Sequence, residues 1–184
     1  MLGSNQKTFL LVLAENAPTI AFLATLQATG ELRIAGWIGV AASAATLGAF
    51  YRFGRTFHPI LLAINLYILL VTPVIEATYL LGLKPQGDFM VAHTQVGVLA
   101  SVFVVGSFLT LLSEKGFVGV ICEPPSRTLR PSILLLVASA AAVAWSATYQ
   151  GNRVMAIVLP LAVLFGLREF LIAGLKDRGA ETGD

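Results

Sequence analysis

Apolar runs recur along this chain, separated by short polar clusters. A bilayer core of about 30 Å needs about 20 apolar residues in a helix. The windows that meet this length are 8–28, 33–51, 57–83, 89–112, 131–149 and 153–175. Each is too long for a membrane β-strand and lacks its alternation of apolar and polar residues. The pattern therefore predicts an all-α integral membrane protein, a bundle of six transmembrane helices that forms a single domain over 1–184.

Polar residues recur at heptad spacing within the third window. They are His58, Asn65, Thr72 and Tyr79, with Glu76 one turn beyond Thr72. At about 100° per residue, all of them fall within about 60° on one face of a helix. Placing a carboxylate inside a bilayer costs at least about 2.5 kcal/mol unless other groups of the protein bind it. We therefore expect this polar stripe to face other helices, divided into an inner and an outer half by Pro73.

Composition and charge strengthen the membrane assignment. The mean hydropathy is +0.82 and 12% of the residues are charged, whereas an ordinary soluble domain is about 25% charged. Lys and Arg cluster on alternate connections, which predicts that both termini are cytoplasmic. The cytoplasmic set is Lys7, Arg52, Arg55, Lys115, Arg127, Arg130, Lys176 and Arg178, against Arg33, Lys84 and Arg153 outside. The net charge of +2 reflects this bias and does not indicate nucleic-acid binding.

Most connections are short, such as KPQGD before the fourth window, and they make neighbouring helices antiparallel. The exception is the loop 113–130. Its FVGVIC run is too short to cross the bilayer, so we expect it to lie at the interface or to dip back. As the longest loop it is the expected contact for a cytoplasmic protein partner. Its Cys122 is the only cysteine, which excludes an intrachain disulfide and a cysteine-rich metal site.

An inner cluster of charged and polar residues is expected from their depths. Glu15 and Arg168 each lie about two turns from the cytoplasmic ends of the first and last spans, at 1.5 Å per residue. Asn65 lies at a similar depth. The interpretation that we favour is a structural clamp between these helices. The alternatives are a proton or ion site, and an Arg168 that reaches the interface without a partner. Glu169 is about 100° away from Arg168 around the helix and is not expected to share its partner.

An outer cluster joins Glu76, Thr72 and Tyr79 to His93 in the fourth window. A neighbouring carboxylate raises the pKa of a histidine through the physiological range, so Glu76 and His93 are candidates for a proton or substrate site. The alternative is an ordinary hydrated histidine near the membrane surface. The two histidines and one cysteine lie at different depths, so we expect no metal site and no cofactor. No catalytic motif is present, and we expect the protein not to be an enzyme.

Small residues predict close helix packing. Gly39 with Ser43, and Ala44 with Gly48, form small-xxx-small pairs in the second window. Six spans also divide naturally into three plus three, and an odd number of spans in each half would give inverted repeats.

The first and last windows resemble the bacterial intracellular septation protein A family. The first carries ENAP, with Glu15 and Pro18, followed by TIAF; the last carries VLPLAVLFGL at 158–167. The resemblance implies a multi-pass protein of the bacterial plasma (inner) membrane, which serves envelope maintenance and septation through protein partners. The family offers no established catalytic residues to carry over to this sequence.

Together these observations predict a non-enzymatic membrane protein of this kind. Two alternatives remain. One is a small proton-coupled transporter or channel, as a monomer or a homo-oligomer, with the third helix lining the path. The other is a membrane subunit of a larger complex.

Overall fold

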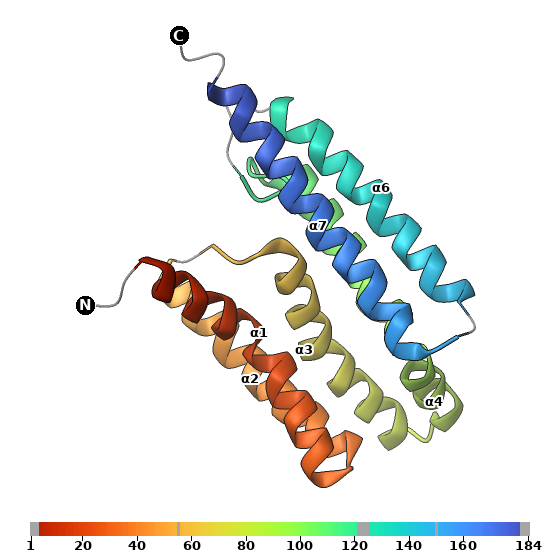
Figure 1. The fold of residues 1–184 in the computed structure, drawn as a ribbon. Coiled ribbons are helices and arrows are strands. Elements are labelled where there is room, and N and C mark those ends of the chain that lie inside the picture. Colours follow the sequence, from red (N-terminus) through yellow and green to blue (C-terminus); the bar gives the residue numbers. More distant parts are fainter. Residues whose placement is uncertain (1–3, 55, 121–125, 150, 181–184) are drawn as a thin grey trace. The chain divides into compact units, whose positions relative to one another are not determined.

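The computed structural model describes residues 4–54, 56–120, 126–149 and 151–180. Over these residues it contains helices and no strand (Figure 1). The helices are α1 (Ser4–Thr29), α2 (Leu32–Arg52), α3 (Pro59–Leu80), α4 (Lys84–Ala92), α5 (Thr94–Leu112), α6 (Ser126–Thr148) and α7 (Arg153–Ala180). The described parts of α2, α3, α5, α6 and α7 are long and apolar enough to cross a membrane. The all-helical fold is thus confirmed for the described residues, and five helices of this length and apolarity are compatible with a multi-pass membrane protein.

The first predicted span, 8–28, lies within α1. This helix is not among the five, and its side chains are described only from Leu13 onwards. The count of six spans and the cytoplasmic position of the termini therefore stay predictions.

The chain divides into two compact units, residues 1–92 and residues 93–184. In the first unit α1 packs along α2, and α2 packs along α3. Figure 1 shows α1 and α2 as a hairpin. The hairpin turn is short because Gly30 adopts a positive φ of 69° and its N–H caps the carbonyl of Leu26. A residue without a Cβ reaches this left-handed conformation at no steric cost, so α1 can end there and α2 can begin two residues later.

Glycines on one face of α2 allow it to approach α3 closely. A Cβ on Gly36 would lie 2.9 Å from Cγ2 of Thr72, and one on Gly39 would lie 3.1 Å from a methyl group of Ile68. The packing prediction is therefore confirmed for Gly39, which is buried. It is wrong for the second pair within this chain, since Ala44 and Gly48 are exposed and nothing lies within 4 Å of a Cβ on Gly48.

The fourth predicted window differs from the structure at its beginning. KPQGD at 84–88 is helical rather than a connection, and the helix is interrupted at His93, where φ is −109° and ψ is 22°. Contacts with α3 explain the helical segment. The Tyr79 hydroxyl donates to Oδ1 of Asp88 at 2.7 Å, and a Cβ on Gly87 would lie 2.8 Å from the Thr78 hydroxyl oxygen. These contacts place α4 against α3, and the spanning helix α5 begins only at Thr94.

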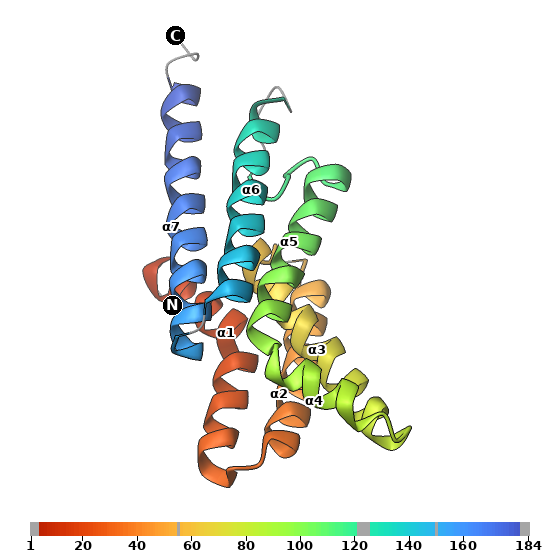
Figure 2. The same ribbon diagram turned by 90° about the vertical axis from the view of Figure 1, so that its right-hand side faces the viewer.

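The second unit consists of α5, α6 and α7, which lie side by side in Figure 2. After α5 the chain turns back onto this unit. Phe117 and Val118 are fully buried. Gly106 in α5 provides the space, since a Cβ there would lie 2.7 Å from the Phe117 ring. Residues 121–125, with Cys122 and the paired prolines, lie outside the described residues.

Candidate functional site

The inner half of the polar stripe is held by one buried amide. Asn65 of α3 is 1% exposed. Its Nδ2 donates to the main-chain oxygen of Glu15 in α1 at 3.2 Å and to that of Leu61 at 2.9 Å. Its Oδ1 accepts a hydrogen bond from the Ser43 hydroxyl of α2 at 3.4 Å. A single side chain therefore joins α1, α2 and α3. The clamp expected from the sequence joined the first, third and last spans, so the contact with α2 was not predicted, and the part of the last span stays a prediction.

The carboxylate of Glu15 caps the beginning of α3. Glu15 is 8% exposed, and its Oε1 accepts the backbone N–H of His58 at 3.1 Å. His58 is the N-cap residue of α3 and makes no side-chain cap hydrogen bond, and Pro59 follows without an N–H. The N-terminus of a helix carries roughly half a positive charge, which stabilises a nearby carboxylate. Glu15 thus supplies from α1 the cap that α3 lacks in its own sequence.

Arg168 contacts two residues of the second unit. Its Nε donates to the main-chain oxygen of Val118 at 3.0 Å, and its guanidinium forms an ion pair with Glu169. Pairing between Arg168 and Glu15 would join residues of different units and stays a prediction. Glu169 is itself a partner of Arg168, because long side chains adjacent in sequence can meet above the helix surface. The expectation that the two residues do not share a third partner stays a prediction.

The buried loop segment is also held from α6. The Ser132 hydroxyl oxygen accepts the N–H groups of Phe117 at 3.1 Å and Val118 at 3.4 Å. A Cβ on Gly116 would lie 2.4 Å from the same oxygen, and Gly116 has a φ of +57°. The loop therefore donates hydrogen bonds to α6 and accepts one from α7, and Gly116 is required for its close approach to α6.

The outer half of the stripe meets α2 and α4. Glu76 forms an ion pair with Arg33 in the first turn of α2, with side chains that are 17% and 71% exposed. Thr72 lies against Gly36 of α2, one turn before Glu76. Tyr79 binds Asp88 of α4, as described above. Glu76, Thr72 and Tyr79 thus all contact neighbouring helices of the first unit.

His93, the fourth member of the outer cluster, is the N-cap residue of α5 and is exposed. It begins the second unit, whereas Glu76 belongs to the first. A proton couple between the two stays a prediction. Arg33 was missed as the partner of Glu76 because charge counting assigned it to a loop. The pair could have been predicted from depth in the membrane. Arg33 lies just after the turn between α1 and α2, at the predicted outer side, and Glu76 lies near the predicted outer end of α3.

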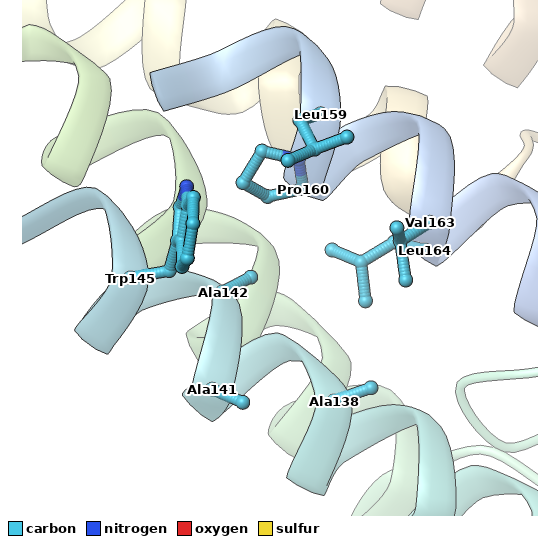
Figure 3. Close-up of a pocket in the computed structure, with 8 residues that line it drawn as sticks. All are labelled: Ala138, Ala141, Ala142, Trp145, Leu159, Pro160, Val163 and Leu164. Atoms are coloured by element: carbon cyan, nitrogen blue, oxygen red, sulfur yellow. The ribbon is translucent and has the colours of Figure 1, made fainter. Parts of the chain in front are cut away.

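An apolar groove of about 330 Å³ lies between α6 and α7 (Figure 3). It is lined by Ala138, Ala141, Ala142, Trp145, Leu159, Pro160, Val163 and Leu164. The Trp145 ring stands at its edge and stacks on Tyr149, with 5.3 Å between ring centroids. Apart from the indole N–H of Trp145, the lining side chains offer no polar group, so the groove has no means of acid–base or nucleophilic chemistry.

A second, smaller pocket of about 260 Å³ lies at the end of α5. Thr110, Ser113, Glu114, Gly116, Thr128, Leu129 and Ser132 line it. It is the more polar of the two, and its hydroxyl and carboxylate oxygens can bind a small polar group. Among the described residues, no three His, Cys, Asp or Glu side chains gather where they could hold a metal ion.

Comparison with protein-family models, curated proteins and solved structures gives no match for this chain. The resemblance to the septation protein A family therefore rests on the motifs in the first and last spans alone.

Proposed function

We propose that this is a non-enzymatic, multi-pass plasma-membrane protein that serves bacterial envelope maintenance or septation through protein partners. The proposal rests on one observation: the described polar side chains of the stripe on α3 make contacts with neighbouring helices. The side-chain amide of Asn65 forms hydrogen bonds with α1 and α2. Glu76 forms an ion pair with Arg33, and the Tyr79 hydroxyl donates a hydrogen bond to Asp88. Polar groups that are paired between helices in this way stabilise a helix bundle without performing chemistry.

The partner surface that fits this proposal is the exposed part of the loop 113–130, on the cytoplasmic side. Phe117 and Val118 are fully buried and are not available to a partner. Leu129 and Arg130, by contrast, are exposed at the beginning of α6. An exposed leucine beside an arginine provides the apolar and cationic contacts common in protein interfaces.

The test is deletion of the gene in its host and complementation with variants. Wild-type protein should restore normal septum formation and envelope integrity, and the double variant L129A/R130A should fail although its level in the membrane is normal. R52A, which removes an exposed arginine at the predicted cytoplasmic end of α2, is the matched control and should complement. Normal septation in the deletion strain, or full complementation by L129A/R130A, would refute the proposal.

A small proton-coupled transporter is the second candidate, and the two units favour it. In each, the first helix packs on the second and the second on the third, with smaller contacts between the first and third. An odd number of spans in each half of the chain is the arrangement of transporters with inverted repeats. Purified protein in liposomes should then acidify the lumen when a proton gradient is imposed, and E76Q should abolish that flux while leaving thermal stability nearly unchanged. Absence of flux in the wild type would eliminate this candidate.

A further inference from the structure

The pocket at the end of α5 has one charged lining residue, Glu114, whose side chain is exposed. The remaining polar lining consists of hydroxyl groups from α5, the loop and α6. The pocket therefore carries negative charge and oxygen atoms, and its ligand should be a cation or a hydrogen-bond donor.

The hydrogen bonds of two hydroxyl groups restrict further which class of ligand the pocket can bind. The Thr110 hydroxyl donates its hydrogen to the carbonyl of Gly106 at 2.8 Å, so its oxygen has only lone pairs to offer a ligand. The Ser113 oxygen accepts the N–H of Lys115 at 3.3 Å and keeps a second lone pair. With the Glu114 carboxylate, three acceptors surround one pocket. A primary ammonium group has three N–H donors, which matches this set.

We propose that this pocket binds a primary ammonium group through Glu114, Thr110 and Ser113. At about 30 Å³ per water molecule, its volume of about 260 Å³ equals roughly nine waters, enough for an ethanolamine-sized group and a few waters. Two sources have this chemistry: the ethanolamine headgroup of a membrane phospholipid, and a free primary amine. The lipid source rests on the proposed membrane placement, since α5 ends at Leu112 and the pocket then lies at headgroup level. The free-amine source does not depend on it.

The experiment measures thermal unfolding of the delipidated full-length protein in detergent. Phosphatidylethanolamine and phosphatidylcholine with identical acyl chains are added in separate arms, because the choline nitrogen has no N–H to donate. The wild type should unfold at a temperature several degrees higher with phosphatidylethanolamine than with phosphatidylcholine. E114Q should lose this difference, and T110V should reduce it. E31Q removes an exposed carboxylate from the beginning of α2 and should keep the difference.

A third arm adds ethanolamine or phosphoethanolamine in solution. A stabilisation by either that disappears in E114Q supports the site and identifies a free amine as a sufficient ligand. Stabilisation by the lipid alone supports the site and identifies the headgroup. Equal effects of the two lipids on the wild type, with no effect of the soluble amines, would overturn the proposal. So would a preference for ethanolamine that persists in E114Q. Lipid preference and septation are separate measurements, so either proposal can fail without the other.

Discussion

Asn65 donates a hydrogen bond from its side-chain amide to the main-chain oxygen of Glu15, fifty residues earlier in the chain. The bond lies one turn before Pro18, which is fully buried in α1. A proline inside a helix removes a main-chain donor and loosens the adjacent turn. In an apolar environment the carbonyls of that turn have no water to bind, so an amide from α3 stabilises α1 at its weakest point.

Replacement of Asn65 by alanine should therefore lower the stability of the folded protein. We expect a loss of about 1–2 kcal/mol, because the Ser43 hydroxyl and the Glu15 carbonyl lose a partner together. The measurement is thermal or denaturant unfolding of the purified protein in detergent micelles. Q27A removes an exposed side-chain amide from α1 and should change stability by less than about 0.5 kcal/mol. Equal stability of N65A and the wild type would show that the amide is not a clamp.

Glu15 offers a second prediction, in which charge and hydrogen bonding can be separated. E15A removes the acceptor of the His58 N–H and should cost about 1 kcal/mol, as the loss of a helix cap does. E15Q keeps an acceptor oxygen but loses the attraction between the carboxylate and the helix N-terminus, so it should cost less than E15A. The measurement is the free energy of unfolding of E15A and of E15Q, each compared with the wild type. A larger loss for E15Q than for E15A would contradict the capping role.

The positions of the helices follow from the apolar pattern because the bilayer sets their length. The window 33–51 corresponds to α2 at Leu32–Arg52, and 153–175 lies within α7. The inward direction of Asn65 likewise follows from the energetic cost of an amide in lipid. Helix positions and the direction of a polar side chain can be predicted from sequence because both depend mainly on the apolar surroundings of the helix.

Other features depend on partners that no local pattern identifies. Pro85 and Gly87 are typical of a turn, yet they belong to α4, which is held by Tyr79 and Thr78 of the preceding helix. One partner of Arg168 is a main-chain carbonyl, and every residue has one. Sequence therefore predicted that Arg168 needs a partner, and it gave no means to choose Val118.

The ion pair between Arg33 and Glu76 leads to a double-mutant prediction. Because Arg33 is largely exposed, the coupling energy should be small, about 0.2–1 kcal/mol, and should fall as salt is added. E76A alone should cost little more than this, whereas R33A leaves a partly buried carboxylate without its cation and should cost more. A cycle of R33A, E76A and the double variant measures the coupling by unfolding. Strictly additive losses would show that the pair contributes nothing to stability.

The contact between Gly106 and Phe117 gives the sharpest prediction for the second unit. A methyl group on Gly106 would lie 2.7 Å from the ring, so G106A should destabilise the protein by about 1–3 kcal/mol through overpacking. G166A and G174A are matched controls in α7, where nothing lies within 4 Å of the added atom. Alanine favours a helix over glycine by up to about 1 kcal/mol, so both controls should be neutral or stabilising.

Shortening the opposing side chain should then rescue the variant. F117L alone should cost stability because it leaves space beside Gly106, but in the G106A background that space accepts the new methyl group. The double variant should consequently be more stable than the sum of the two single losses implies, as measured by unfolding. Additive losses would mean that the loop can move away from α5, and that burial of Phe117 is not what holds the segment 113–120 against the second unit.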